Sequence, residues 1–349
     1  MRPIAVDLFA GAGGTTLGLR RAGFDVRVAV DCDPHKARTL SINNPGVNVL
    51  GIPGTVGDVR RIDGNTIRSA GGIRKGSVAL VSGCPPCQGF SLQGNRDPGD
   101  PRNELPFEFT RLVRELAPRS VVFENVVGIK SFSSGSVIGS VNGRLHRAGY
   151  ETEMWELDAQ DYGVPQARKR IFVIGLRGID LPMPPRPSGK TIGAWEAIAD
   201  LPARRMSSRC AESMPIRYRS DSRSSFAKAM RGRRRRVANC ETTTHAPSIL
   251  RRITSLDWEE RDDKTWHRRL HPRKPAPTLT AGSRTRTACR PIHPYSDRVI
   301  TVREGARLAS FPDWYRFPRH IAESWSQIGN AVPPMIAEKI FRRIRDCLE

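Results

Sequence analysis

The stretch IAVDLFAGAGG at residues 4–14 decides the fold of this chain. Residues 4–9 form the kind of apolar run that makes a buried strand, and a glycine-rich turn follows them. Helical periodicity then runs from about residue 15 to residue 22, and a second apolar strand is predicted at residues 26–30. A strand, a glycine turn, a helix and another strand in this order are typical of a doubly wound α/β domain.

Strand and helix patterns continue to alternate as far as residue 176. We predict strands at residues 78–82, 121–123 and 171–176, and helices near residues 103–116 and 137–148. Because strands that alternate with helices usually pair in parallel, the predicted fold is a Rossmann-like α/β domain with a mainly parallel sheet.

The character of the chain changes after residue 178. Residues 181–294 are rich in Pro, Arg, Ser and Thr and show poor periodicity, which indicates a smaller, loop-rich domain. Periodicity returns from residue 298, and a final helix within residues 331–344 carries apolar residues at helical spacing: Met335, Ile336, Ile340 and Ile344. We therefore predict one domain made of residues 1–178 plus 298–349, with the C-terminal helix packed back on it, and a second domain at residues 179–297.

The charge of the chain indicates a polyanionic partner. Lys and Arg number 57 against 35 Asp and Glu, which gives a formal net charge of +22, and the basic excess is densest between residues 204 and 290. Such a charge attracts nucleic acid. Coding bias in GC-rich DNA is an alternative source, because Arg greatly outnumbers Lys, but the uneven distribution favours binding.

The composition also bears on the compartment. A hydrophobic fraction of 38% with 26% charged residues is ordinary for a globular protein. The start of the chain lacks the pattern of a signal peptide, and no apolar run reaches the roughly 20 residues that cross a bilayer. The 7 cysteines show no framework spacing, which fits a reducing compartment. We expect a cytoplasmic protein without membrane contact.

The stretch GCPPCQGFS at residues 83–91 places two cysteines directly after a predicted buried strand. Pro85 and Pro86 stiffen the turn, so Cys87 is presented at the tip of the strand. Cys84 and Cys87 also fit a thioredoxin-like redox pair or half of a zinc site. The chain has no second CxxC, which disfavours zinc, and the redox alternative depends on the partners found elsewhere.

The glycine turn and Asp31 together predict an adenosine-containing ligand. The turn lacks the third glycine of the dinucleotide fingerprint, since Thr16 stands there, but it offers a strand end, accessible backbone and a helix N-terminus. Asp31 closes the next strand, where a carboxylate commonly binds a ribose diol. The structural alternative is that the glycines serve only the tight turn and that Asp31 is the N-cap of the following helix.

Two further segments carry candidate catalytic side chains. Glu124 in FENV follows an apolar strand and is expected at the same sheet edge as Cys87, where burial favours the protonated carboxyl form needed for acid work. Arg168 and Arg170 in QARKR enter the strand at residues 171–176, and alternation would aim both at one face, where they can bind an anionic or carbonyl group. A solvent-exposed strand end and a solvated basic run are the alternatives.

In their order along the chain these segments resemble the bacterial cytosine-5 DNA methyltransferases. The resemblance rests on DLFAGAGGTTLGL, VAVDCDP, Asp58 in GDV, GCPPCQGFS, FENV, QARKR, REGARLASFPDW and QIGNAVPP, which cover both ends of the chain. Residues 179–292 lack strong signatures, although KPAPTLT and RPIHPYSDRVITVRE look like the family's usual exit from that region. The resemblance implies the S-adenosylmethionine-dependent methyltransferase fold with a smaller target-recognition domain.

The resemblance also implies a role for each matching residue. Cys87 matches the nucleophile that adds to C6 of cytosine, and Glu124 matches the residue that hydrogen-bonds N3. Arg168 and Arg170 match the pair that supports the flipped base and the thiol, with Arg170 expected at the base carbonyl. Pro86 shapes the turn beside Cys87, and Cys84 becomes a bystander.

Other positions match the residues that line the S-adenosylmethionine pocket of the family. They are Asp7, Phe9, Gly11, Gly13, Gly14, Asp31, Cys32, Asp58, Val59, Pro86, Leu105, Asn330 and Ala331. The family usually carries Glu where Asp31 stands, so the loss of one methylene predicts a looser ribose contact. No metal is implied.

Physical chemistry supports this combination of side chains. C5 of cytosine is too electron-poor to attack a methyl donor unless a nucleophile first adds at C6, and protonation at N3 relieves the resulting negative charge. A thiolate and a protonated carboxyl therefore belong together. The target base must also leave the duplex. Residues 88–102 resemble a loop that closes over it, with hinges at Gly89, Gly94 and Gly99.

The resemblance implies a DNA (cytosine-5-)-methyltransferase of a restriction-modification or orphan methylation system, which releases S-adenosylhomocysteine. The recognition domain would bind double-stranded DNA, with its arginines divided between phosphates and base edges and with Thr278 to Thr280 as a candidate contact. We expect a monomer, and the resemblance allows a separately encoded cognate restriction endonuclease as partner. The alternatives are a tRNA cytosine-5 methyltransferase of the same fold and a catalytically idle DNA-binding relative. The long basic segment argues against the first, and the joint presence of Cys87, Glu124, Arg168 and Arg170 argues against the second.

Overall fold

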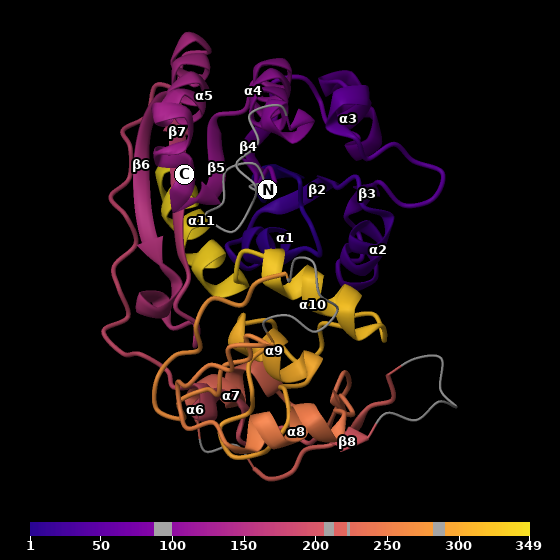
Figure 1. Cartoon of the computed structure of the whole chain (residues 1–349). Helices are drawn as coiled ribbons and strands as arrows, with labels where there is room; N and C mark the ends of the chain where they lie inside the picture. The colour runs from indigo at the N-terminus through magenta and orange to yellow at the C-terminus, as the bar shows by residue number, and fades with distance from the viewer. Residues whose placement is uncertain (87–99, 206–212, 222–223, 282–289) are drawn as a thin grey trace. The chain divides into compact units, whose positions relative to one another are not determined.

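The computed structural model describes residues 1–86, 100–205, 213–221, 224–281 and 290–349. The chain forms two compact units (Figure 1). The first unit consists of Met1–Asp158, Lys169–Arg186 and Ile336–Glu349, and the second of Ala159–Arg168 and Pro187–Met335. Among the described residues, no helix is both long and apolar enough to span a membrane.

A seven-stranded sheet forms the centre of the first unit, with the strand order β3-β2-β1-β4-β5-β7-β6. The strands from β3 to β5 pair in parallel, whereas β7 runs antiparallel to both of its neighbours. This arrangement confirms the mainly parallel sheet predicted from the sequence. The strands are β1 (Ile4–Leu8), β2 (Asp25–Val30), β3 (Asn48–Leu50), β4 (Val78–Gly83), β5 (Ser120–Val126), β6 (Glu151–Asp158) and β7 (Lys169–Leu176).

Helices α3, α4 and α5 lie in a row along one face of this sheet (Figure 1). The α-helices of the first unit are α1 (Gly14–Arg21), α2 (Pro34–Asn43), α3 (Gly64–Gly71), α4 (Leu105–Leu116), α5 (Ser136–Arg147) and α11 (Pro334–Leu348), whose first residues belong to the second unit. The 3-10 helices are η1 (Val59–Arg61), η2 (Pro101–Glu104), η3 (Val127–Lys130) and η4 (Phe132–Gly135). Helix α11 contacts α1, where the Arg345 guanidinium donates to the Ala22 carbonyl oxygen at 2.8 Å.

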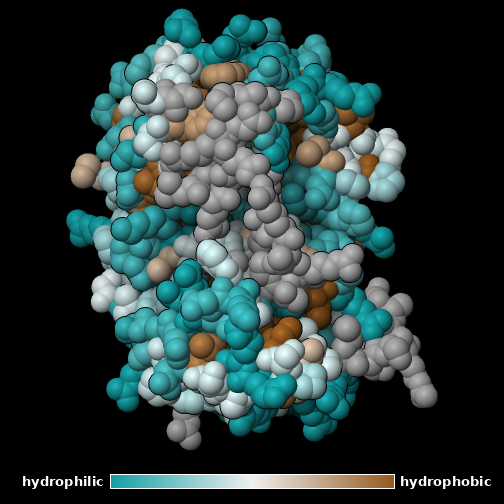
Figure 2. Space-filling model, viewed as in Figure 1, coloured by the Kyte–Doolittle hydropathy of each residue, from teal (hydrophilic) through white to brown (hydrophobic). Residues whose placement is uncertain are grey.

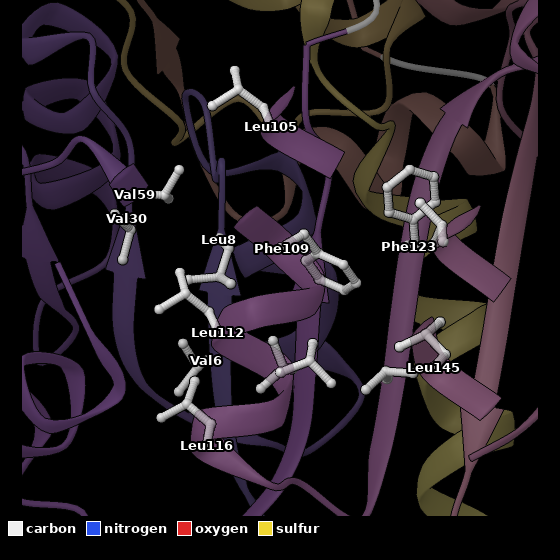
Figure 3. Packing of buried hydrophobic residues seen from close by; sticks show 14 of the residues in the cluster. Val6, Leu8, Val30, Val59, Leu105, Phe109, Leu112, Leu116, Phe123 and Leu145 are labelled. Atoms are coloured by element: carbon white, nitrogen blue, oxygen red, sulfur yellow. The ribbon is translucent and has the colours of Figure 1, made fainter. Parts of the chain in front are cut away.

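The core under α4 orients the strands that carry the candidate site. Val6 and Leu8 of β1 face Phe109 and Leu112 of α4, and the Phe109 ring packs against Phe123 of β5 with centroids 5.5 Å apart (Figure 3). Since neighbouring residues of a strand point to opposite faces, this packing directs Asp7 away from α4. The apolar alternation of β1 thus decides which face the carboxylate occupies.

The predicted elements all occur, within a few residues of their expected bounds. Strands β3 and β6 and helices α2 and α3 are additional. β6 escapes a search for apolar runs because it is an edge strand that alternates exposed and buried residues, and β3 has only 3 residues. Hydrophilic side chains dominate the described surface on the face shown in Figure 2, where apolar residues occur in small groups.

The second unit is built from short helices and two-residue ladders, as a loop-rich segment predicts. Its helices are η5 (Ala159–Tyr162), α6 (Ala194–Ile198), α7 (Ser225–Arg231), α8 (Pro247–Thr254), α9 (Val302–Leu308) and α10 (Ile321–Asn330). Strand β9 (Ile216–Arg217) pairs antiparallel with β10 (Arg236–Val237), and β8 (Arg204–Arg205) pairs in parallel with β11 (Glu241–Thr242).

The compact units divide the chain at other residues than the predicted domain boundaries of 178/179 and 297/298. Helices α9 and α10 belong to the second unit. The physical reason is a set of buried polar bonds: the Arg303 guanidinium donates to the Ala238 carbonyl oxygen at 3.0 Å, and Arg307 donates to the Ala197 carbonyl oxygen at 2.9 Å. The helical periodicity that returns at residue 298 is a local pattern, so it could not show these bonds to distant residues.

Candidate active site

The carboxyl ends of β1, β4 and β5 meet at one edge of the sheet. These three strands are neighbours and run in parallel, so the turns that follow them lie at the same edge. β1 leads into the glycine turn, β4 into Cys84, Pro85 and Pro86, and β5 carries Glu124 near its end. The fold therefore gathers the three segments that the sequence singled out.

The glycine turn after β1 has an open backbone. Phe9, Gly11 and Gly13 adopt the left-handed conformation, with φ of 54°, 56° and 92°. Among the described residues, no atom lies within 4 Å of a Cβ built on Gly11, so these residues leave space for a ligand beside it. Gly14 begins α1, whose N-terminus lies directly behind the turn. Both the tight turn and the approach of a ligand require glycine here.

Asp31 binds the glycine turn instead of capping a helix. Its carboxylate accepts hydrogen bonds from the Gly11 N–H at 2.8 Å and from the Asp33 N–H at 3.0 Å. Helix α2 is capped by Asp33, whose side chain accepts from the backbone N–H groups of His35 and Lys36. The alternative that Asp31 is the N-cap is thus wrong. Burial raises the pKa of Asp31 above its ordinary value.

Asp7 lies fully buried beneath the same turn. The Thr16 hydroxyl donates to Oδ2 of Asp7 at 2.6 Å, while Oδ1 has no hydrogen-bond partner among the described residues. Burial raises the pKa of Asp7 to about 7, and the nearby Asp31 carboxylate adds to the rise. Asp7 and Asp31 are therefore a coupled pair of carboxyl groups at the turn. The hydrogen bond from Thr16 to Asp7 was missed from the sequence, although Thr16 lies only two residues after Gly14.

The other residues of the first unit that were predicted to line the pocket lie after β2, at η1 and at the start of α4. Cys32 is an exposed residue beside Asp31. Partial burial of its thiol raises its pKa, and the Asp31 and Asp58 carboxylates add to the rise. Asp58 caps η1 and forms an ion pair with Arg60 at 2.7 Å. Val59 and Leu105 are buried in the core cluster that Phe9 borders (Figure 3).

Glu124 forms a buried ion pair at the end of β5. Its Oε1 lies 3.2 Å from Nε of Arg170 on β7, and the side chains of Arg170 and Glu124 are 16% and 11% exposed. The neighbouring Asn125 donates its side-chain N–H to the Pro85 carbonyl oxygen at 3.3 Å. The solvent-exposed alternative for Glu124 is thus wrong. The hydrogen bond from Asn125 also ties β5 to the turn that leads toward Cys87.

The described part of that turn ends at Pro86, so Cys87 and the predicted loop hinges Gly89, Gly94 and Gly99 lie outside the described residues. Cys84 extends the pairing of β4, because its N–H donates to the Leu8 carbonyl oxygen at 3.3 Å. Burial and then the negative charge of Glu124 raise the pKa of the Cys84 thiol. Cys84 is therefore held as a neutral thiol, unsuited to act as the nucleophile.

Arg168 and Arg170 fall in different compact units. β7 begins at Lys169, so Arg170 lies on this strand, whereas Arg168 precedes it and belongs to the second unit. There the Arg168 guanidinium is buried and donates to the Leu279 carbonyl oxygen at 3.1 Å. Arg170 pairs with Glu124 within the first unit. The shared face expected from strand alternation stays a prediction.

Four other predicted positions lie in the second unit. Asn330 ends α10 and Ala331 is its C-cap, so their part in the pocket stays a prediction. Thr278 uses its hydroxyl to donate to the Ala167 carbonyl oxygen at 2.7 Å, and the Thr280 carbonyl oxygen accepts from the Trp325 indole at 3.0 Å. Both threonines thus hold the second unit together.

Comparison with known proteins agrees with this geometry. The model of the family "C-5 cytosine-specific DNA methylase" matches residues 4–346. The Type II methyltransferase M.XorII of Xanthomonas oryzae pv. oryzae is 36% identical, over 99% of this chain and 85% of its own length. The Type II methyltransferase M.DdeI of Desulfomicrobium norvegicum is 34% identical, over 97% of this chain and 88% of its own length.

Solved structures show the same fold. The crystal structure of an E. coli prophage protein, described as a candidate DNA modification methyltransferase, superposes with a TM-score of 0.84 at 31% identity and covers 99% of both chains. The S. pombe Dnmt2 methyltransferase, with a TM-score of 0.65 at 15% identity and full coverage of both chains, shares the fold. Sequence and structure agree that this chain belongs to the C-5 cytosine-specific DNA methylase family.

Proposed function

We propose that the chain transfers the methyl group of S-adenosylmethionine to C5 of a cytosine in double-stranded DNA, with Cys87 as nucleophile and Glu124 as acid. The observation that carries this assignment is the buried Glu124–Arg170 pair, which lies at the end of β5 beside the turn leading to Cys87. Family membership supports both the reaction and the methyl donor.

The residues around the glycine turn fit the proposed methyl donor. The described residues leave space beside Gly11, and the Asp31 carboxylate hydrogen-bonds the same turn, which supports an adenosine group there with Asp31 at its ribose. The unpaired Oδ1 of Asp7 is a further buried acceptor beneath the turn. When bound there, S-adenosylmethionine supplies an activated methyl group.

The side chains then divide the reaction between them. The Cys87 thiolate forms a bond to C6 of cytosine. Glu124, which takes up a proton from solvent as the base binds, gives that proton to N3 and so relieves the charge on the ring. C5 then takes the methyl group, and S-adenosylhomocysteine remains. Removal of the C5 proton by a base and cleavage of the bond between C6 and sulfur restore the ring and release Cys87. Arg170 holds the Glu124 carboxyl in position, and Arg168 is proposed to support the flipped base.

The second unit is proposed to bind the duplex from which the base is flipped. β9 and β10 pair so that Arg217 lies directly opposite Arg236, and both are exposed. Directly opposed like charges destabilise a ladder, so this pair favours a polyanionic partner. No carboxylate among the described residues forms an ion pair with either arginine.

We also propose that the enzyme serves a restriction-modification system as a cytoplasmic monomer. The support is that M.XorII and M.DdeI, which match nearly the whole chain, are named Type II methyltransferases. A cognate endonuclease would then cut the same site when it is unmethylated.

Product analysis tests the proposed function. Purified protein, labelled S-adenosylmethionine and unmethylated plasmid DNA should yield 5-methylcytosine on nucleoside analysis, and bisulfite sequencing should place it within one short recurring sequence. Label that appears in tRNA and not in DNA would favour the RNA enzyme. Absence of label from both nucleic acids, with the donor still bound, would favour an idle relative.

Glu124→Gln should lower the rate constant of methyl transfer by about 10²–10⁴, because the amide cannot donate a carboxyl proton to N3. Single-turnover methylation of plasmid DNA measures this step. Glu156→Gln is the matched control, since Glu156 on β6 is exposed and pairs only with the exposed Lys130 among the described residues. Equal rates for the two variants would remove Glu124 from the chemistry.

A further inference from the structure

A hairpin at residues 259–269 of the second unit presents two arginines side by side. Backbone bonds connect its strands: the Asp262 N–H donates to the His267 carbonyl oxygen at 2.9 Å and the Arg269 N–H to that of Glu260 at 3.0 Å. These bonds flank the bridge between Arg261 and Arg268. The two arginines therefore form a non-hydrogen-bonded pair, the kind whose Cα atoms lie only about 4.5 Å apart.

The two arginine side chains project from the same side of this ladder and repel each other. Both are exposed, and among the described residues no carboxylate forms an ion pair with either. Three of the four acidic residues of the hairpin are engaged elsewhere, with Glu260 accepting from the Asp257 N–H at 2.8 Å, whereas Asp263 is exposed. Asp262 binds Thr265 and Arg252, and Glu259 binds Lys274. The arrangement thus costs free energy in the isolated protein and leaves a concentrated positive charge at the surface.

Trp266 holds one of these arginines in place. Its ring lies under the Arg261 guanidinium, which is 4.6 Å from the ring centroid, and the indole is 57% exposed. Cation–π contact of this kind fixes a long side chain that would otherwise sample many rotamers. Trp266 also adopts the left-handed conformation with φ of 62°, which is rare and strained for a bulky residue.

The turn is built to keep Trp266 in this conformation. The Asp262 carboxylate accepts from both the backbone N–H and the hydroxyl of Thr265 at 2.6 Å, and the Trp266 N–H donates to the Asp262 carbonyl oxygen at 2.8 Å. This arrangement combines an exposed, strained tryptophan with two arginines of like charge, and it does not stabilise the isolated protein. It favours the binding of a ligand that contacts both guanidinium groups.

We infer that Arg261 and Arg268 form a clamp for one backbone phosphate of DNA, with Trp266 as the residue that positions Arg261. This inference rests on the proposed function, which supplies duplex DNA as the ligand. Two guanidinium groups match the acceptor oxygens of a phosphate, and its charge removes their mutual repulsion. Phosphate contacts position the protein on the duplex without reading its sequence, so the clamp should change affinity and leave the methylated sequence unaltered.

The double variant Arg261→Gln/Arg268→Gln tests the clamp. Binding of a fluorescein-labelled 30-base-pair duplex of mixed sequence, measured by anisotropy from about 50 to 200 mM salt, gives the affinity and its salt slope. We expect the affinity at 0.1 M salt to fall about tenfold or more and the slope to fall by about 1–2. The melting temperature should stay equal or rise, because the repulsion is gone. A purely structural pair would lower the melting temperature and leave the salt slope unchanged.

Trp266→Gly separates positioning from charge. Glycine adopts φ of 62° without strain, so folding should be unharmed, while Arg261 loses its support. DNA affinity should fall severalfold with an unchanged salt slope. Affinity equal to that of the wild-type protein would overturn the role of Trp266.

The matched control is Arg74→Gln/Lys75→Gln, which removes the same net charge. Both residues are exposed and precede β4, so they lie at the amino end of that strand, opposite to the candidate site. This control should bind the duplex like the wild-type protein. An equal loss of DNA affinity in the control would mean that net charge alone explains the effect of the double variant, and would overturn the clamp.

The outcomes also separate the clamp from the proposed function. Each variant is assayed for methyl transfer to plasmid DNA at saturating DNA, where the clamp variants should keep the wild-type rate constant and the same bisulfite pattern. An active wild-type protein whose clamp variants bind DNA normally would overturn the clamp alone. A wild-type protein without methyl transfer, whose clamp variants still lose DNA affinity, would overturn the proposed function alone.

Discussion

Cys87→Ser should reduce methyl transfer at least about 1,000-fold while DNA binding stays close to that of the wild-type protein. Serine lacks the easily formed thiolate that adds to C6, and without that bond C5 stays too electron-poor to take a methyl group. Binding of the duplex is proposed to depend on charges of the second unit, which this substitution leaves unchanged. Labelled methyl transfer to plasmid DNA and duplex anisotropy measure the two properties in parallel.

Cys84→Ala provides the control for this prediction. Cys84 lies three residues upstream on the same turn, and its neutral thiol is held beside Glu124. We expect this variant to keep substantial activity.

A duplex that carries 5-fluorocytosine should also trap the wild-type protein covalently, because elimination requires a proton at C5. Retained activity in Cys87→Ser, or trapping by that variant, would overturn the nucleophile assignment.

Arg307→Met should destabilise the second unit by about 3–5 kcal/mol, because it strands two buried carboxylates. The side chain of Arg307 is fully buried. It donates to Asp313 at 2.6 and 2.9 Å and also binds Asp200, whose side chain is 2% exposed. Burial alone would lower the pKa of Arg307, but the hydrogen bonds and charges of Asp313 and Asp200 outweigh it and raise the pKa. The melting temperature of this unit should fall by roughly 10 °C.

Arg342→Met is the matched control for this stability prediction. Arg342 on α11 is exposed and pairs with Glu338 one helical turn away, so its loss should cost at most about 1 kcal/mol. Thermal and urea unfolding of both variants measure the difference. Similar unfolding curves would mean that Asp200 and Asp313 find other partners or protons in the variant, and would remove the ion cluster as a determinant of stability.

The same cluster predicts a loss of stability in acid. Burial would raise the pKa of Asp313, but the hydrogen bond and charge of Arg307 outweigh it and hold the pKa below the ordinary value of 3.8. A carboxyl whose pKa is lowered by folding contributes its full stability above about pH 4 and loses it as the pH falls further. In Arg307→Met this part of the acid dependence should disappear.

The sequence by itself determined the fold class and the family, because both depend on local patterns. The buried strands have apolar runs of characteristic length. Residues 4–14 and 83–91 carry motifs whose chemistry can be inferred without knowing which residues lie near them in the fold. Edge strand β6 was not found, since its alternating polar residues carry no apolar run.

The tertiary structure alone decided how the polar side chains are paired. Asp31 could cap a helix or bind the glycine turn, and only the fold shows that it accepts the Gly11 N–H. Arg168 and Arg170 looked equivalent, yet the fold assigns Arg168 to the second unit and pairs Arg170 with Glu124 in the first. The opposed pair Arg261 and Arg268 lies seven positions apart in the chain and meets through a hairpin. These hydrogen bonds and ion pairs join segments that come together only when the chain folds. A local sequence pattern therefore cannot predict which polar side chains pair with each other.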